Sequence, residues 1–373
     1  MDSREYSAED SFSASRLILG RKCRGLTKGA LAQAADISER SLTAYEKEEK
    51  RPKPLTVERI ATALNFPVAF FYGAPTEEPL IEATSFRALS TLTARQRDQA
   101  IGGAALALDL SSWIDQRFKL PIPDVPRVRG VDAEAAAIAV RNEWGLGERP
   151  VRNMLHLLEA HGVRVFSVTQ DSLRVDAFSF WRGDTPYVFL NTMKSAEHRR
   201  MDAAHELGHL VLHWGREATR ARSDEQAAHA FGSAFLMPAG SVRALAPRAG
   251  RVSELVRAKH HWNVAVANLA YRMHSLKLLS EWQYRTVFIE ISKRGYRTAE
   301  PQTSVPETSL ILEKVFSQLR DRGVSKSDVA AAINIQVEDL NDLIFGLTLT
   351  PLTGEGRVGH RNSETEKPDL RIV

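Results

Sequence analysis

Residues 201–213 read Met-Asp-Ala-Ala-His-Glu-Leu-Gly-His-Leu-Val-Leu-His, and this stretch decides the fold of the region around it. Its apolar residues recur at helical spacing, which predicts a helix over residues 196–214 with Ser195 as the N-cap. Residues i and i+4 are neighbours on a helix, so this HExxH motif brings His205 and His209 together, where they can hold one zinc ion. Glu206 is turned away from direct ligation and is expected to be the catalytic base that accepts a proton from the attacking water.

A catalytic zinc site needs a third protein ligand and one open position. A second helix is expected at residues 224–237, and its small residues Ala228 and Gly232 allow it to approach the first helix closely. Glu225 shares their face and ranks first as the third ligand. Asp224 and His229 remain alternatives. His213, one turn beyond His209, is interpreted as a neighbour of the ligands rather than as a ligand.

Two motifs carry a resemblance to a known family: His205-Glu206-Leu207-Gly208-His209-Leu210, and Glu225-x-x-Ala228-x-x-Phe231 followed by Leu236-Met237-Pro238. They resemble the ImmA/IrrE family of metallopeptidases, and the resemblance extends less specifically over residues 135–295. It implies that His205, His209 and Glu225 bind Zn²⁺ and that Glu206 is catalytic. It also implies cleavage of a helix-turn-helix repressor, the best-known activity of the family. The substrate stays open between a separate repressor, a partner protein and this chain itself.

Strands are expected just before this helical pair. Residues 162–168 alternate as a strand does, and residues 177–181 and 186–191 flank a turn, which predicts a hairpin. Phe178, Phe180 and Tyr187 are interpreted as strand core, although on a sheet edge they would line subsites for an extended peptide.

Residues 14–72 are expected to form short helices with a helix-turn-helix at their centre. Thr27 and Ser38 are N-cap residues of two successive helices, and in DNA-binding folds the start of the second helix enters the major groove. Leu42 and Tyr45 are expected to face inward and Ala44 outward. Arg21 and Lys50 suit phosphates. The residues predicted to contact DNA are Lys28, Ser38, Glu39, Arg40, Thr43 and Lys47.

Residues 16–72 closely resemble the Cro/phage-repressor-like (XRE) family of helix-turn-helix domains. The residues that carry the resemblance are Leu26-Thr27, Leu31-Ala32, Ile37-Ser38, Leu42, Tyr45-Glu46, Pro52, Ile60-Ala61, Leu64 and Phe70-Phe71. Glu48 stands where the family often has glycine. Residues 16–53 hold ten Lys/Arg and five Asp/Glu, and this local basic excess favours DNA over the alternative, a helical adaptor that contacts protein.

An offset of 298 residues relates this segment to a second one near the C-terminus. Gly25, Leu31 and Leu42 correspond to Gly323, Val329 and Leu340, so the apolar frame is kept. The helix in the recognition position carries instead the acidic residues Glu338, Asp339 and Asp342, which would repel phosphates. The similarity indicates either generic geometry of a small helical bundle or a protein-binding module.

The chain of 373 residues is thus predicted to have an α+β fold: an all-α helix-turn-helix domain, a zincin-like metallopeptidase domain with a small sheet, and a helical C-terminal module. The expected divisions are residues 14–73 (helix-turn-helix), 74–130 (helical linker region), 131–300 (peptidase), 301–350 (C-terminal module) and 351–373 (polar tail). The single cysteine, Cys23, is expected to be a buried or half-buried small residue and fits a reducing cytoplasm.

The predicted function is that of a cytoplasmic, DNA-binding regulator with zinc-dependent endopeptidase activity toward a regulatory protein. The alternative is a transcription factor whose peptidase-like domain is a non-catalytic sensor or scaffold. The expected partners are double-stranded DNA, a protein substrate such as a repressor, and a second copy of the chain in a homodimer. No apolar run approaches the ~20 residues needed to cross a membrane.

Overall fold

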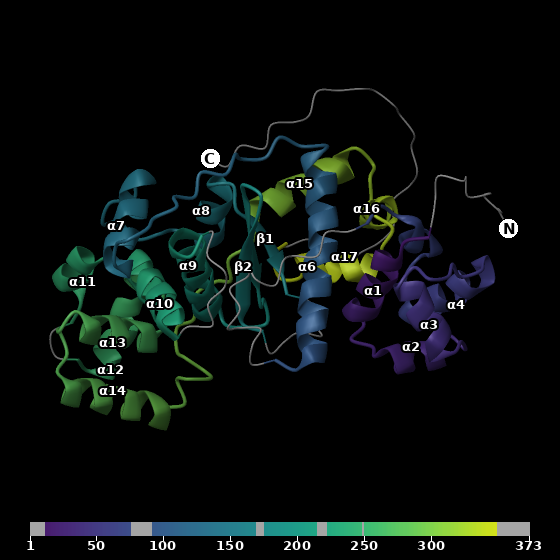
Figure 1. Ribbon diagram of the computed structural model, residues 1–373. Helices are drawn as coiled ribbons and strands as arrows, with labels where there is room; N and C mark the ends of the chain where they lie inside the picture. The colour runs from purple at the N-terminus through teal and green to yellow at the C-terminus, as the bar shows by residue number, and fades with distance from the viewer. Residues whose placement is uncertain (1–11, 76–91, 169–174, 215–221, 248–249, 349–373) are drawn as a thin grey trace.

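The computed structural model of the chain describes residues 12–75, 92–168, 175–214, 222–247 and 250–348. Figure 1 shows a purple helix-turn-helix unit on one side, a body built around a small sheet, and yellow C-terminal helices beside both. The α+β prediction is confirmed. The polar tail expected at residues 351–373 lies outside the described residues.

The N-terminal unit consists of short helices whose starts are capped as the sequence indicates. Thr27 accepts a hydrogen bond from the Ala30 amide at 3.1 Å, and Ser38 accepts one from the Ser41 amide at 3.1 Å. Leu17 and Leu42 have no exposed surface, so the helices close on a dry core. The elements are α1 (Ala14–Cys23), α2 (Lys28–Ala34), α3 (Glu39–Glu46), α4 (Pro54–Leu64) and the 3-10 helix η1 (Val68–Tyr72).

Helix α6 (Ala94–Asp115) joins this unit to the body. Gly102 lies against α1, where a Cβ atom would come within 2.8 Å of the Cys23 sulfur, so only glycine permits this approach. An ion pair of 2.6 Å between Arg16 and Asp109 adds a second link between the two helices. Cys23 is buried, as the sequence predicts.

The body contains a three-stranded sheet with the order β1-β3-β2. Strand β1 (Arg164–Ser167) pairs in parallel with β3 (Thr185–Leu190), and β2 (Ala177–Arg182) pairs with β3 as an antiparallel hairpin. Phe178, Phe180 and Tyr187 are buried, which confirms their interpretation as strand core. Strand β2 lies at the edge of the sheet.

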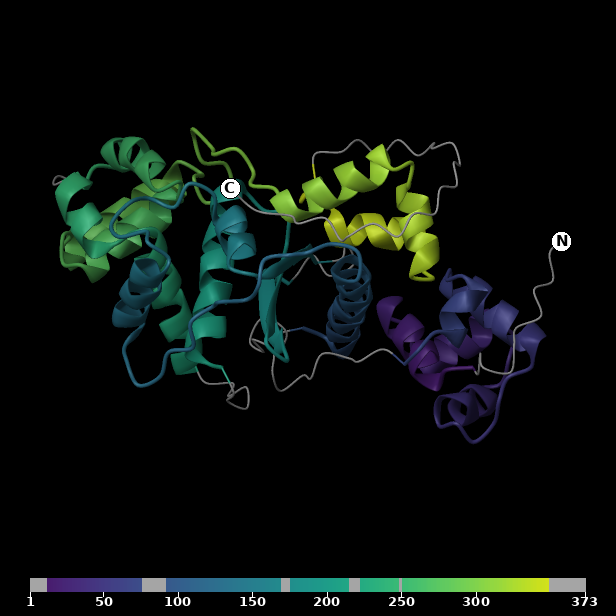
Figure 2. The same cartoon turned by 90° about the horizontal axis from the view of Figure 1, so that it is seen from above.

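Helices cover both faces of this sheet. In Figures 1 and 2 the sheet lies between α6 on the side of the helix-turn-helix unit and α9 (Ala196–Leu212) on the other side. Helix α10 (Arg222–Leu236) packs on α9. The sheet and α6 therefore separate α9 and α10 from the helix-turn-helix unit.

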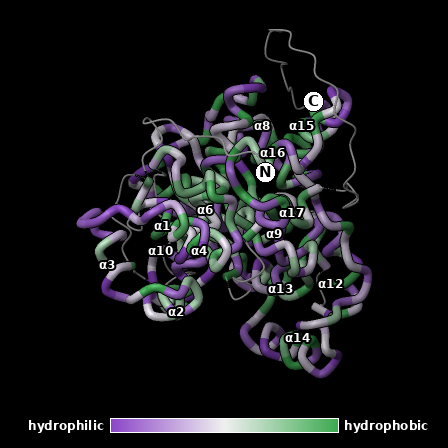
Figure 3. The backbone as a smooth tube through the Cα atoms, turned by 90° about the vertical axis from the view of Figure 1, so that its right-hand side faces the viewer, coloured by the Kyte–Doolittle hydropathy of each residue, from purple (hydrophilic) through white to green (hydrophobic). Residues whose placement is uncertain are grey.

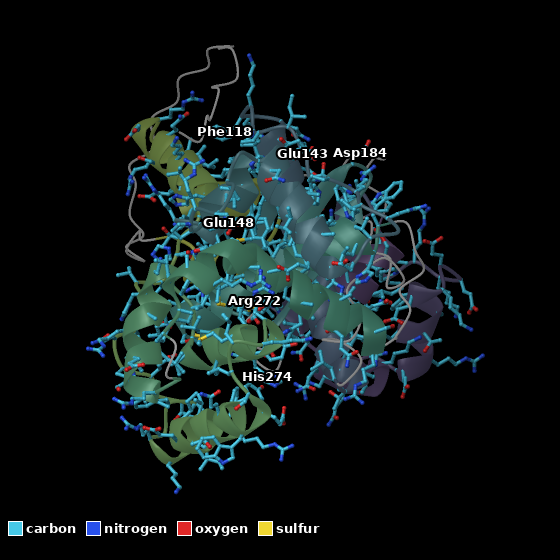
Figure 4. The ribbon with its side chains drawn as sticks, turned by 90° about the vertical axis from the view of Figure 1, so that its left-hand side faces the viewer. Phe118, Glu143, Glu148, Asp184, Arg272 and His274 are labelled. Carbon is cyan, nitrogen blue, oxygen red and sulfur yellow. The ribbon has the colours of Figure 1, made fainter. Side chains whose placement is uncertain are left out.

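The outer helices complete the body. Buried Arg272, labelled in Figure 4, ties them together. Its guanidinium binds both carboxylate oxygens of Glu134 at 2.6 Å and donates to the Met237 carbonyl at 2.8 Å. These elements are α7 (Ala133–Glu143), α8 (Met154–Ala160), α11 (Ala239–Leu245), α12 (Val252–Ala258), η4 (Lys259–His261), α13 (Val266–Ser275) and α14 (Glu281–Lys293).

The last helices are α15 (Leu310–Asp321), α16 (Lys326–Ala332) and α17 (Val337–Ile344). Glu159 of α8 caps the first of them: its carboxylate accepts the Leu310 amide at 2.9 Å and the hydroxyl of Ser309. Burial outweighs these hydrogen bonds and raises the pKa of Glu159 to about 7. Among the described residues, no helix has the length and apolar character needed to span a membrane.

Candidate metal centre and nucleic-acid interface

Helix α9 carries the HExxH motif and begins at the predicted N-cap, Ser195, whose side chain accepts the His198 amide at 3.3 Å. Leu207 and Val211 are buried against the rest of the body. This fixes the rotation of the helix, so that His205 and His209 project from the side that faces α10. The side chain of His205 is 19% exposed and that of His209 is 9% exposed, which leaves a path to solvent.

Two glycines determine how closely α10 approaches α9. A Cβ atom on Gly232 would lie 2.9 Å from the His205 amide nitrogen, and one on Gly208 would lie 3.0 Å from the Ala228 carbonyl oxygen. Any larger residue would push the two backbones apart. The small-residue face predicted for α10 is therefore the contact face, and it brings Glu225 to the histidines.

His205, His209 and Glu225 form a group of three possible metal ligands. The two histidine Nε2 atoms are 3.0 Å apart, and each is 3.4 Å from a different carboxylate oxygen of Glu225. Ligand atoms bound tetrahedrally to zinc at 2.0–2.1 Å lie about 3.3 Å from one another. The donor set and its spacing therefore fit a zinc ion, with the fourth position left for a water or a substrate atom.

The other candidate ligands lie outside this triangle. His213 Nδ1 is 3.0 Å from His209 Nδ1, and His213 Nε2 is 3.6 Å from an Asp224 oxygen. Asp224 and His213 thus support the ring of His209 from behind, as residues next to metal ligands commonly do. The ring of His229 is 6.5 Å from that of His205 and contacts Tyr271 edge-on at 4.9 Å.

Glu206, next to His205 in the motif, is only 2% exposed, and its side chain reaches the sheet. Its Oε2 atom accepts a hydrogen bond of 2.7 Å from the hydroxyl of Ser179 on β2. Sequence reasoning missed Ser179. The available signal was its pattern, because it is a hydroxyl between Phe178 and Phe180 in a strand whose side chains are otherwise apolar at this point.

In the metal-free site, the interactions among His205, His209 and Glu225 favour the charged forms of Glu225 and His205. Burial opposes ionisation of Glu225, but hydrogen bonds from His205 and His209 outweigh it and hold the pKa of this carboxyl well below its usual range. Burial likewise opposes protonation of His205, but the hydrogen bond with Glu225 and the charge of Glu206 raise its pKa above the usual value. The site thus attracts a cation.

The predicted DNA-contacting residues lie on the outer side of the helix-turn-helix unit. Ser38, Glu39, Arg40 and Lys47 are exposed, and Thr43 is half-buried at the same helix. Ala44 is 7% exposed, so the expectation that it faces outward is wrong. Leu42, Ala44 and Glu46 are the buried residues of α3.

Two basic residues expected at phosphates have a partner within the domain. Glu46 is buried, and its carboxylate binds Arg21 at 2.6 Å and Lys28 at 2.9 Å. The Arg21 side chain is 13% exposed, whereas that of Lys28 is 38% exposed. Arg21 therefore holds α1 to α3. Lys28 keeps part of its surface at the start of α2, where a phosphate contact remains a prediction.

Comparison with protein families gives two matches. Residues 158–274 match the model of the IrrE N-terminal-like domain of the M78 peptidase family, and residues 20–71 match a helix-turn-helix model. The first match contains the three possible metal ligands His205, His209 and Glu225, and the second contains α2 and α3. A comparison with curated proteins gives no match. The chain thus joins a helix-turn-helix domain to an IrrE N-terminal-like domain, as the resemblances in the sequence indicate, and both matches support a DNA-binding regulator with a peptidase-like domain.

Proposed function

We propose that this protein is a zinc-dependent endopeptidase that binds DNA and cleaves a regulatory protein, with a helix-turn-helix repressor as the leading substrate class. One observation carries the proposal: a His-His-Glu triangle of ligand atoms lies beside a carboxylate, Glu206, that a hydroxyl of the neighbouring strand holds in place. A structural zinc site has four protein ligands and needs no such carboxylate.

His205, His209 and Glu225 would hold the zinc ion, which supplies a Lewis acid that lowers the pKa of a water molecule. Glu206 takes the proton of the attacking water and passes it to the leaving amine. Ser179 keeps the carboxylate of Glu206 in one orientation. His213 and Asp224 fix the ring of His209, so that its Nε2 atom would stay available to the zinc ion.

The edge strand β2 supports a peptide substrate. Among the described residues β2 pairs with β3 alone, and it carries the hydroxyl that binds Glu206. An extended peptide that added to this edge would run past the catalytic carboxylate, and its main chain would be recognised whatever its side chains are.

The position of the site favours cleavage of a separate molecule. The sheet and α6 lie between α9 and the helix-turn-helix domain of the same chain (Figures 1 and 2). That domain is fastened to α6 through the close contact of Cys23 with Gly102 and the ion pair of Arg16 with Asp109. We therefore propose cleavage in trans, with the DNA-binding domain bringing the peptidase near regulators bound at the same operator.

The experiment that tests this function uses the full-length protein loaded with zinc. It is incubated with helix-turn-helix proteins encoded beside it, and the products are identified by mass spectrometry, with a chelator-treated sample as the control. Cleavage at a defined bond that requires zinc supports the peptidase. If every such protein stays intact while zinc changes operator affinity, the peptidase-like domain is a sensor, and the proposal is wrong.

A further inference from the structure

Residues 309–347 repeat the first three helices of the N-terminal unit, α1, α2 and α3, as α15, α16 and α17. With the offset of 298, α16 and α17 coincide residue for residue with α2 and α3. The turn after the first helix has a left-handed residue at Gly25 and at Gly323, and the turn between the next two helices has one at Asp36 and at Asn334. Generic packing of three helices does not require left-handed residues at the same two places.

The backbone hydrogen bonds of these turns repeat as well. The Leu26 amide donates to the Arg21 carbonyl at 3.1 Å, and the equivalent Val324 amide donates to Leu319 at 2.9 Å. The Ile37 amide donates to Ala32 and the Ile335 amide donates to Ala330, both at 3.0 Å. These matching turns support a second helix-turn-helix in the C-terminal module over the generic geometry of a small helical bundle.

The two units differ at one buried contact and in the charges that the second helix of the motif carries. The buried ion pair of Arg21 with Glu46 is replaced by Leu319 and Ile344, which are both buried and apolar. Helix α3 exposes Arg40, whereas α17 carries only acidic charges. Because phosphates repel such a helix, the second unit has kept the scaffold but not a surface for DNA.

Helix α17 binds the first helix-turn-helix instead. Arg24, at the end of α1, donates to both carboxylate oxygens of Asp339 at 2.6 and 2.8 Å, and the Asp339 side chain is 11% exposed. Arg24 is fixed within its own domain, because it donates to the Leu64 carbonyl at 2.7 Å and stacks on the ring of Phe66 at 4.2 Å. A bidentate pair of this kind is among the stronger charged contacts.

The opposite end of the module is attached to the metal-bearing helix. Arg200 of α9 forms an ion pair with Glu307, and Arg199 donates to the Glu307 carbonyl at 2.8 Å and to the Gly346 carbonyl at 3.2 Å. The Glu307 carboxylate also accepts the Met154 amide at the start of α8 at 2.9 Å. Figure 2 shows the yellow module reaching from the body to the purple helix-turn-helix unit.

We propose that the C-terminal module is a helix-turn-helix unit that has exchanged DNA for protein as its ligand, and that it clamps the DNA-binding domain of the same chain to the metal-bearing body. Its acidic helix α17 binds Arg24, and Glu307 binds α9. The clamp leaves the DNA-reading helix free: α3 lies at the edge of the view in Figure 3, well away from α17. The module therefore sets the orientation of α3 relative to the metal centre and does not block DNA.

Two matched substitutions in the full-length protein test the clamp. Asp339→Asn and Glu338→Gln each remove one negative charge from α17, but Glu338 is exposed and Asp339 holds Arg24. We expect amide hydrogen exchange in residues 64–66 and in α17 to accelerate about 10-fold in Asp339→Asn, the scale for losing a charged hydrogen bond. Glu338→Gln should exchange like the wild type. Operator affinity should change less than about threefold in both, because neither residue faces DNA.

A charge exchange keeps the test independent of local misfolding. Arg24→Asp alone should accelerate exchange as Asp339→Asn does, and Arg24→Asp combined with Asp339→Arg should restore slow exchange. The proposal is overturned if Asp339→Asn and Glu338→Gln behave alike, or if the exchanged pair restores nothing. A rise in operator affinity of tenfold or more in Asp339→Asn alone would also overturn it, because the module would then be an inhibitor of DNA binding rather than a clamp.

Discussion

The Ser179 hydroxyl lies 2.7 Å from Oε2 of Glu206 and joins the edge strand of the sheet to the carboxylate of the HExxH motif. Both residues are 2% exposed, so water does not compete for this hydrogen bond. A carboxylate that transfers a proton from a water molecule to a leaving group works best in one fixed orientation. The strand thus contributes to the site through a residue that is not itself a ligand.

Removing this hydroxyl should slow the reaction without removing the metal. Ser179→Ala leaves Glu206 buried and lacking this hydrogen bond, and we expect kcat to fall about 10-fold or more with little change in KM or zinc content. Ser167→Ala is the matched control, because Ser167 is also a buried strand serine but bonds to Val168 and Thr192. Equal kcat in Ser179→Ala and wild type would show that the hydroxyl does not position the base.

The third ligand is tested by metal content. Glu225→Ala removes an oxygen from the ligand triangle and should abolish stoichiometric zinc binding, as should His205→Ala. His229→Ala and Asp224→Ala should keep the zinc; for Asp224→Ala we expect affinity lowered by about 10-fold, because Asp224 supports the His213–His209 pair. Full zinc occupancy in Glu225→Ala, with loss in Asp224→Ala or His229→Ala, would assign the third ligand differently.

Zinc affinity should depend on pH near neutrality. His205 must lose its proton before its ring nitrogen can bind the metal. Since the pKa of His205 is raised in the metal-free protein, zinc still displaces a proton from it at pH values where an ordinary histidine is already neutral. Affinity should therefore fall as the pH falls, by up to about 10-fold per pH unit for one proton. Calorimetry in buffers of different ionisation enthalpy counts the protons released, and a count of zero at pH 7 would contradict this account.

Substitutions in the helix-turn-helix domain should distinguish residues that contact bases from residues that contact phosphates. Arg40→Ala or Thr43→Ala should weaken binding to a specific operator by ~1–3 kcal/mol, while Lys28→Ala should weaken binding to all duplexes alike. Band-shift titrations at several salt concentrations measure the affinity of each variant for the operator and for unrelated DNA. If a truncated protein without residues 1–75 binds the operator as tightly as the full chain does, the assignment of DNA binding to this domain is wrong.

The sequence predicted those features that depend on local spacing. The helical pair, the hairpin, the caps at Thr27 and Ser38, and the contact face with Gly232 follow from residues a few positions apart, and the structure confirms them. The offset of 298 also emerged from the order of residues alone. In each of these patterns, the spacing of the residues along the chain determines their positions on a helix or a strand.

Contacts between distant segments were not predictable in the same way. Ser179 precedes Glu206 by 27 positions, and Arg24 precedes Asp339 by 315, so no spacing rule connects them. The side of α3 on which Ala44 lies is not predictable from the sequence, because a single small residue gives no directional signal on a short helix. Lys28 and Arg21 were interpreted by charge alone, whereas the structure shows that buried Glu46 binds both.

The most direct test of the proposed function is the rate at which Glu206→Gln cleaves the substrate of the wild-type protein. The substitution keeps the size of the side chain and leaves His205, His209 and Glu225 in place, so zinc content and fold should be unchanged. It removes the group that accepts the proton, and cleavage should fall by ~10²-fold or more. Cleavage by Glu206→Gln at the wild-type rate, with the same zinc content, would contradict the mechanism.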